Sequence, residues 1–216
     1  MITIIDYGVG NLFSLISSLK MIGADAVATS DPEAIKEADK LILPGVGAFA
    51  DAIEKLKASG LDALIKQQAQ AGKDIMGICL GMQLLFEKSF EYGEHEGLGL
   101  LKGSVVPMRG VIPAELKIPH IGWNALKFAK KSPLFRFINE GDCVYFVHSY
   151  YATDCSDSVI ATAEYGAELT QKKNELIANV IMGKLTYEQA MEQFESEGYA
   201  AQSQEIVDSL NAQLNK

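Results

Sequence analysis

The chain has 216 residues, 48% of them hydrophobic and 22% charged, the proportions of an ordinary globular domain able to bury a sizeable core. Its 28 acidic and 19 basic side chains leave a net charge of −9 without a basic cluster, which argues against nucleic acid and anionic membranes as partners. The first residues lack the basic segment of a signal peptide, and no apolar run reaches the roughly 18 residues of a membrane span, so we expect a cytoplasmic protein.

Short apolar runs and helical patterns alternate over the first 78 residues. Asn11 is expected to cap the first helix and Gly23 to end it, because Asn accepts from free N–H groups and Gly tolerates a left-handed turn. This alternation predicts an α/β fold in which helices cover both faces of a parallel sheet. We expect strands at residues 3–5, 26–28, 40–43 and 74–78, and helices at residues 12–22, from Pro32 onward, at 48–58 and at 61–71.

Residues 77–81 read Gly-Ile-Cys-Leu-Gly and lie between an apolar run and a helical pattern that begins at Leu80. This pattern is typical of a nucleophile elbow, in which a strand turns sharply into a helix and exposes one reactive side chain. The glycines avoid a Cβ clash in the turn, and a helix N-terminus favours a thiolate. Cys79 is therefore a candidate nucleophile. The alternative is a buried core cysteine, the commoner role of a single cysteine.

A glycine-rich loop, Pro-Gly-Val-Gly at residues 44–47, follows the strand expected at 40–43. Because reactive loops of parallel sheets lie at the carboxyl ends of the strands, this loop and Cys79 can share one crevice. A backbone N–H of the loop would then act with the N–H of Leu80 to stabilise a tetrahedral oxyanion. Taken alone, the loop is equally compatible with a plain turn.

From residue 97 to 166 the pattern changes to β-rich segments separated by turn residues. We expect these segments to form hairpins and edge strands that extend the parallel sheet, without a separate domain. The clearest runs are at residues 103–108, 121–126, 143–151 and 159–163.

Each of the three histidines is compatible with a structural role. His95 stands between two glutamates and is expected on the solvated surface, whereas His120 precedes a strand and is structural or at an interface. His148 lies in an apolar strand, where a hydrogen-bonded structural histidine is commoner than a base. Cys143 and Cys155 are expected to be inert, since the cysteines have neither disulfide nor metal-site spacing.

The composition changes again after Thr170, since every proline, cysteine and histidine lies before this residue. Apolar residues at 176–181 and 206–214 recur at helical spacing, and residues 186–189 read Thr-Tyr-Glu-Gln, a capping box. We therefore expect the main domain over residues 1–170 and a helical tail over residues 171–216.

Five motifs together resemble a class I, triad-type glutamine amidotransferase, and within that class the glutaminase subunits of imidazole glycerol phosphate synthase. The elbow is shared by the whole class, whereas the first and fourth motifs single out this subunit, and the fourth motif disfavours the vitamin B6 glutaminase. The resemblance runs from residue 1 to about 170. The motifs are Asp-Tyr-Gly-Val-Gly-Asn-Leu at 6–12, Leu-Pro-Gly-Val-Gly-Ala-Phe at 43–49, Gly-Ile-Cys-Leu-Gly-Met-Gln at 77–83, Pro-His-Ile-Gly-Trp-Asn at 119–124 and Tyr-Phe-Val-His-Ser-Tyr at 145–150.

The resemblance implies a glutaminase that uses no cofactor and no metal. In this family the cysteine attacks the side-chain amide of glutamine, a glutamyl thioester forms, and ammonia passes to a (β/α)₈-barrel synthase subunit in histidine biosynthesis. Carried onto this chain, Cys79 is the nucleophile, and the N–H groups of Val46 and Leu80 are the oxyanion donors. The resemblance also implies that Gly47, Gln83, Ser149 and Tyr150 bind glutamine, and that Asn11, Trp123 and Asn124 lie near the synthase interface.

The chain departs from the family in its C-terminal part. The family carries a Phe-His-Pro-Glu-Lys-Ser stretch that supplies the histidine and glutamate of the triad, whereas no histidine follows His148 here. Without that histidine nothing evident protonates the leaving ammonia or activates water, and His148 is the one candidate substitute base. Two functions stay open: a glutaminase subunit with impaired turnover, or a non-catalytic remnant or chimera that binds glutamine or the synthase.

Overall fold

A computed structural model describes residues 1–114, 116–165, 189 and 192 of the chain. These residues divide into two compact units. The first unit contains Met1–Pro107 and Tyr150–Ser158, and the second contains Met108–Ser149 and the described residues from Val159 onward. Apart from residues 189 and 192, the helical tail predicted at 171–216 lies outside the described residues.

Four parallel strands form the first sheet of the first unit. They are β1 (Ile2–Ile5), β2 (Ala26–Thr29), β3 (Lys40–Leu43) and β4 (Asp74–Gly77), in the order β2-β1-β3-β4. Every neighbouring pair is parallel, which confirms the predicted α/β class. The central strands β1 and β3 are buried along most of their length, and this is why they read as continuous apolar runs.

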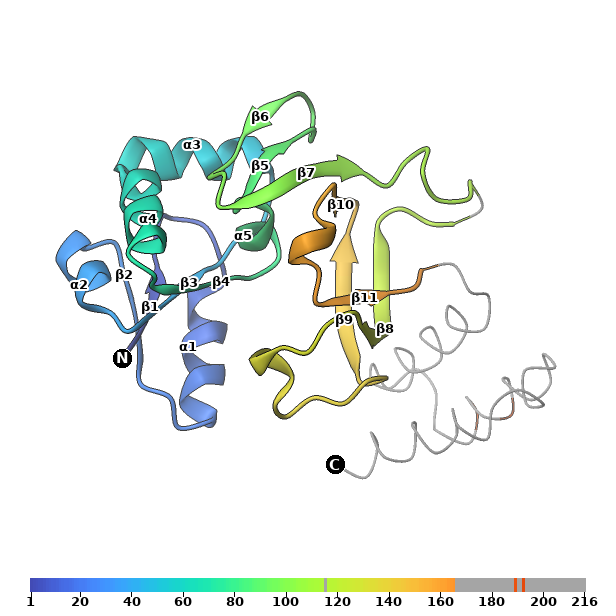
Figure 1. Ribbon diagram of the computed structural model, residues 1–216, viewed down its shortest axis with the longest axis horizontal. Coiled ribbons are helices and arrows are strands. Elements are labelled where there is room, and N and C mark those ends of the chain that lie inside the picture. Colours follow the sequence, from blue (N-terminus) through green and yellow to red (C-terminus); the bar gives the residue numbers. More distant parts are fainter. Residues whose placement is uncertain (115, 166–188, 190–191, 193–216) are drawn as a thin grey trace. The chain divides into compact units, whose positions relative to one another are not determined.

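Helices cover both faces of this sheet, as predicted. The chain passes from β1 to β2 through α1 (Leu12–Met21) and returns beyond β1 to β3 through α2 (Pro32–Glu37). Because such crossovers are right-handed, the reversal of direction places α1 and α2 on opposite faces. The next two helices, α3 (Phe49–Ser59) and α4 (Leu61–Gln70), connect β3 to β4. This crossover runs the same way along the sheet as the one through α2, so α3 and α4 lie on the same face as α2. Figure 1 shows α1 across the strands from α3 and α4.

Local capping signals and one apolar cluster hold these helices in place. The Asn11 side chain accepts a hydrogen bond from the Ser14 N–H at 3.2 Å, which confirms Asn11 as the N-cap of α1. On the other face of the sheet, Leu41 and Leu43 of β3 pack in one buried cluster with residues of α3 and α4 such as Leu56. This cluster fixes the strand ends from which the candidate site is built.

The helical pattern that begins at Leu80 forms only a short helix after Cys79. Its bounds are Leu80–Gln83, labelled α5, and the strand β5 (Phe86–Ser89) follows almost at once. The carbonyl groups that would continue the helix accept hydrogen bonds from a later segment: Leu84 accepts from the Leu98 N–H, and Leu85 from the Leu100 N–H, both at 2.8 Å. Tertiary pairing therefore ends the helix after a single turn.

The predicted β segments are present, but the prediction that they extend the parallel sheet is wrong. In the first unit, β5 pairs with β6 (His95–Glu96) and β7 (Leu101–Pro107), and β7 pairs with β10 (Tyr150–Thr153), giving a second sheet of order β10-β7-β5-β6. In the second unit, β8 (His120–Phe128) lies between β9 (Cys143–His148) and β11 (Ala161–Ala163). These strands take each other as hydrogen-bonding partners, so none of them is added to β4.

Candidate active site

Cys79 stands at the junction of strand β4 and helix α5, as the elbow pattern predicts. Its backbone has φ 54° and ψ −119°, a conformation that residues with a Cβ atom rarely adopt. The Ile78 N–H donates to the Leu43 carbonyl at 3.0 Å, and the N–H groups of Met82 and Gln83 donate to the Cys79 carbonyl. The turn therefore holds the thiol outward, where its side chain is exposed.

Both glycines of the elbow are required by close backbone contacts. A Cβ atom on Gly77 would lie 2.4 Å from the Cα of Met82, and one on Gly81 would lie 1.9 Å from the carbonyl oxygen of Leu43. Neither glycine has a positive φ. The spacing of the motif therefore reflects how tightly the turn packs on itself at Gly77 and on the end of β3 at Gly81, because no other residue leaves enough room.

The glycine-rich loop at residues 44–47 packs directly on the elbow. A Cβ atom on Gly45 would lie 2.5 Å from the backbone nitrogen of Gly81 and 2.9 Å from the Cβ of Leu80. Val46 is exposed, and Gly47 has φ 88°. The N–H of Leu80 is at the first position of α5, where a helix supplies no acceptor of its own. The prediction that this loop and Cys79 share one crevice is consistent with these contacts.

Tyr7 supports the start of this loop, a role that the sequence analysis missed. Its hydroxyl donates a buried hydrogen bond of 2.7 Å to the carbonyl oxygen of Pro44. Burial raises the pKa of Tyr7 to about 12, so the hydroxyl keeps its proton over the whole physiological range. Residue 7 is far from residue 44 in sequence, so no local pattern indicates the contact.

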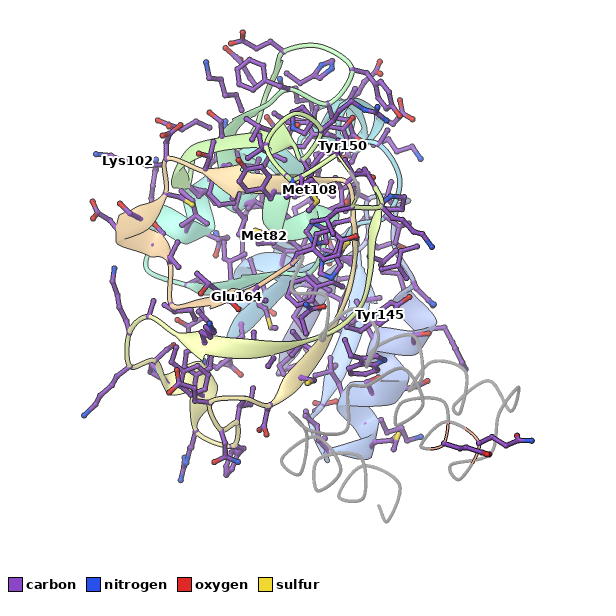
Figure 2. The ribbon with its side chains drawn as sticks, turned by 90° about the vertical axis from the view of Figure 1, so that its right-hand side faces the viewer. Met82, Lys102, Met108, Tyr145, Tyr150 and Glu164 are labelled. Atoms are coloured by element: carbon purple, nitrogen blue, oxygen red, sulfur yellow. The ribbon has the colours of Figure 1, made fainter. Side chains whose placement is uncertain are left out.

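The residues expected to bind glutamine are distributed over both units. Gly47, the half-buried Gln83 at the end of α5, and Tyr150 at the start of β10 belong to the first unit, whereas Ser149 belongs to the second. Tyr150 is labelled in Figure 2, and its ring meets that of Tyr92 edge-on at 6.4 Å. Burial raises the pKa of Tyr150 above its ordinary value, and the nearby charge of Glu91 adds to the rise.

The helix dipole supports the Cys79 sulfur less than the sequence implies, because helix α5 is short. Helix α5 has only four residues, and the dipole of a helix is a sum over its aligned peptide units. A single turn therefore contributes little positive potential at the sulfur. The unusual backbone conformation and the exposure of Cys79 remain as the features that favour a nucleophile.

His148 and His120 form a hydrogen-bonded pair in the second unit. They face each other in the register of β8 and β9, and the His148 Nε2 atom lies 3.0 Å from the His120 Nδ1 atom. This arrangement agrees with the expectation that His148 is a hydrogen-bonded structural histidine. His148 belongs to the second unit and Cys79 to the first.

The proton positions in this pair follow from Asn124. Its amide group donates to the Glu164 carbonyl at 2.5 Å, so its oxygen is the atom that accepts from His120 Nε2 at 2.8 Å. His120 Nδ1 is then the acceptor for a proton on His148 Nε2. Burial lowers the pKa of His120 below its ordinary value; the hydrogen bond with Asn124 opposes this shift, and the charge of His148 adds to it. Glu164 is labelled in Figure 2.

His95 is not on the solvated surface, contrary to the prediction. It is half-buried in β6, its ring lies 6.5 Å from that of Phe49, and its Nε2 atom is buried. The neighbouring glutamates suggested a polar loop, but the pairing of β5 with β6 turns the ring inward.

Known proteins match most of the chain. Residues 1–116 match the family of CobB/CobQ-like glutamine amidotransferase domains. The HisH subunit of imidazole glycerol phosphate synthase from Caldanaerobacter subterraneus subsp. tengcongensis is 53% identical over 170 residues, which cover 78% of this chain and 82% of that protein. The HisH subunit from Lactococcus lactis is 51% identical over 76% of this chain and 80% of that protein. This chain belongs to the HisH family of glutamine amidotransferases.

Solved structures support the fold of this HisH-family chain. A glutamine amidotransferase structure covers 74% of this chain and 78% of its own length, with a TM-score of 0.58 and 17% identity. A second glutamine amidotransferase, from Thermotoga maritima, covers 97% of this chain and 93% of its own length, with a TM-score of 0.51 and 14% identity. At these identities the likeness concerns the fold alone.

The three residues of the HisH-family chain that were expected near a synthase differ in exposure. Asn11 is exposed at the start of α1. Trp123 is half-buried, with its ring 5.6 Å from that of Tyr145. Asn124 is only 2% exposed, and its amide is bonded inside the second unit.

Among the described residues there is no group of three or more His, Cys, Asp and Glu side chains that could hold a metal ion. Within the same part of the chain, no helix has both the length and the apolar character of a membrane span.

Proposed function

We propose that this chain is a glutaminase subunit of an imidazole glycerol phosphate synthase, and that it hydrolyses glutamine through a thioester on Cys79. The observation that carries the proposal is the backbone conformation of Cys79 at a strand-to-helix turn, with the thiol exposed. A strained backbone at such a turn is typical of catalytic nucleophiles. The cysteines are free thiols, which fits a reducing cytoplasm.

The reaction converts glutamine and water into glutamate and ammonia. The Cys79 sulfur attacks the side-chain amide carbon, and the C=O electron pair moves onto oxygen. The C–N bond then breaks, and the nitrogen leaves as ammonia after gaining the proton that the thiol has lost. Water attacks the resulting thioester, the C–S bond breaks, and the proton of the water returns to sulfur as glutamate leaves.

The glycine-rich loop and the elbow supply the electrostatic part of this reaction. The N–H groups of Val46 and Leu80 stabilise the oxyanion of the two tetrahedral intermediates, and the contact of Gly45 with Gly81 supports this assignment. Glutamine is held by Gly47, Gln83, Ser149 and Tyr150.

Turnover is impaired because proton transfer lacks its usual group. No histidine follows His148 in the sequence, and the family takes its base from that region. The His148 Nε2 atom donates to His120, so Nδ1 is the atom at which His148 would have to accept a proton. Loss of a triad histidine typically reduces turnover by several orders of magnitude, so Cys79 forms the thioester and releases it slowly.

The ammonia passes to a (β/α)₈-barrel synthase subunit, the partner of the HisH family. The exposed Asn11 and the half-buried Trp123 are the surface residues for this partner. Asn124 contributes indirectly, through the segment that it holds against Glu164.

A non-catalytic role is the second candidate, and the engagement of His148 with His120 favours it. In that case the chain binds glutamine or the synthase without turnover. The features that bind glutamine are the same in both cases, so only a measurement of glutamine turnover distinguishes the two functions.

Glutamate release from glutamine, measured with the partner synthase present, tests the proposal. We expect slow release by the parent chain and none by Cys79→Ala, with Cys143→Ala as the matched control for the loss of a thiol. Release by His148→Ala equal to that of the parent chain excludes His148 as the base. Fast release that both Cys79→Ala and His148→Ala abolish would make His148 the base. Release indistinguishable between the parent chain and Cys79→Ala would support the non-catalytic role.

A further inference from the structure

We propose that Glu91 is a positioning residue for the glycine-rich loop at residues 44–47, acting through the N-terminus of helix α3. One Oε atom of Glu91 accepts a hydrogen bond of 2.6 Å from the backbone N–H of Phe49, the first residue of α3. This inference rests on the proposed function, because the loop matters through the oxyanion that Val46 stabilises.

Helix α3 lacks a cap from its own sequence. The residue at its N-cap is Ala48, whose side chain makes no capping hydrogen bond. The first N–H groups of a helix have no partner within the helix, and a carboxylate near them is favoured by the helix dipole. Glu91, 42 residues further along the chain, supplies the acceptor that Ala48 cannot.

The carboxylate is carried by the turn between β5 and β6, which backbone hydrogen bonds tie to the second sheet. The Glu91 N–H donates to the buried Ser89 hydroxyl at 3.2 Å, and the Phe90 N–H donates to the carbonyl of Val105 at 2.8 Å. Phe49 is fully buried. One end of the hydrogen bond is thus held by the hydrogen bonds around Glu91 and the other by the burial of Phe49, which is the condition for a positioning residue.

The loop is consequently held on both sides of Val46. Tyr7 fixes Pro44 before it, and Glu91 fixes Phe49 after it. Between these anchors Gly45 packs on Gly81. A backbone N–H acts as an oxyanion donor only if it is preorganised at the position where the charge develops, and the Glu91 bond restricts the loop on the side where α3 begins.

The inference separates Glu91 from a residue that binds the substrate directly. A hydrogen-bond acceptor is partly replaced by the amide oxygen of Gln, so Glu91→Gln should retain more activity than Glu91→Ala. A carboxylate that only contacted the substrate ammonium group would instead change the substrate concentration for half-saturation and leave the exchange of residues 44–50 unchanged.

Two measurements test the inference on the full chain. The first is amide hydrogen exchange in peptides that cover residues 44–50. The second is the rate of thioester formation with the γ-(p-nitrophenyl) ester of glutamate: the Cys79 sulfur bonds to the ester carbon, the C–O bond breaks, and p-nitrophenolate leaves without needing a proton. Alkylation of Cys79 by iodoacetamide, which forms no oxyanion, reports thiol access. Glu54→Ala is the control, since Glu54 is an exposed glutamate on the same helix.

We expect Glu91→Ala to raise exchange in residues 44–50 and to slow thioester formation about 10-fold. Iodoacetamide alkylation should stay within about twofold of the parent rate, and Glu54→Ala should change none of the three. Unchanged exchange in Glu91→Ala would overturn the inference, as would a loss in Glu91→Ala confined to the substrate concentration for half-saturation. If the parent chain releases no more p-nitrophenolate than Cys79→Ala, the proposed function fails, and exchange alone decides whether Glu91 holds the loop.

Discussion

Gly81 of the elbow and Leu43 of the neighbouring strand are in direct backbone contact, since a Cβ atom on Gly81 would lie 1.9 Å from the Leu43 carbonyl oxygen. The same carbonyl accepts the N–H of Ile78. The nucleophile turn is therefore built onto β3, and its geometry depends on the strand that leads into the glycine-rich loop.

We expect Gly81→Ala to lower the free energy of unfolding by about 3 kcal/mol, at the upper end of overpacking costs, because the clashing atoms belong to the backbone. Gly72→Ala is the control. It has φ 84° and open space around a Cβ atom, so it should cost only about 1–2 kcal/mol of conformational strain. Urea unfolding measures both values, and equal losses would mean that the close contact relaxes cheaply.

The strain at Cys79 predicts that glycine is more stable than alanine at this position. Strain in a sparsely populated conformation costs about 1–3 kcal/mol, whereas glycine loses about 0.4–1 kcal/mol through the entropy of the unfolded chain. Cys79→Gly should therefore exceed Cys79→Ala in free energy of unfolding by about 1 kcal/mol. Thermal unfolding of the two variants gives the comparison, and a less stable glycine variant would show that the turn carries no strain.

Removing the Tyr7 hydroxyl should destabilise the first unit. In Tyr7→Phe the buried carbonyl of Pro44 loses the donor that holds it, and a buried polar group without a partner costs about 1–3 kcal/mol. Urea unfolding at pH 7.5 gives the loss.

The same substitution should alter the stability at high pH. Unfolded Tyr7 loses its proton near the ordinary pKa of 10.0, whereas the folded phenol keeps it up to a pKa of about 12. The folded state then binds more protons in this interval, so the stability that Tyr7 contributes below pH 10 is lost as the pH rises toward 12. Tyr7→Phe should lose less stability than the parent chain between pH 9 and pH 11. Identical losses would mean that Tyr7 titrates in the folded state as it does in the unfolded state.

The buried His120 predicts that the second unit weakens in mild acid. Burial lowers the pKa of His120 from its ordinary value of 6.5, so the unfolded state binds more protons once the pH falls below about 6.5. Stability should therefore fall from pH 7.5 to pH 5.5. In His120→Gln this fall should be smaller, while the stability at pH 7.5 is reduced by the loss of the bond to His148. Urea unfolding at the two pH values tests this, and equal slopes would contradict it.

The order of strands and helices up to β4 follows from local sequence signals. Asn11 caps α1 through its own side chain, and the apolar runs of β1 and β3 reflect burial on both faces. The strand-to-helix position of Cys79 also follows from the spacing of two glycines, because few backbones avoid the clashes that the turn creates.

Only the tertiary structure decided which distant groups meet. Leu84 and Leu85 have the periodicity of a helix, but their carbonyls accept from Leu98 and Leu100, so α5 ends after one turn. The later strands pair with each other and form separate sheets, because an alternating pattern identifies a strand but not its partner.

The features of the candidate site also fall into two groups, those that the sequence indicates and those that only the tertiary structure decides. The sequence by itself indicated the candidate nucleophile and the glycine-rich loop, and it shows no histidine beyond His148. The bonds of Tyr7 to Pro44 and of Glu91 to Phe49, and the pairing of His120 with His148, were decided by the tertiary structure. Residues that share one local turn leave a pattern in the sequence, whereas contacts between residues tens of positions apart depend on how the sheets and helices pack.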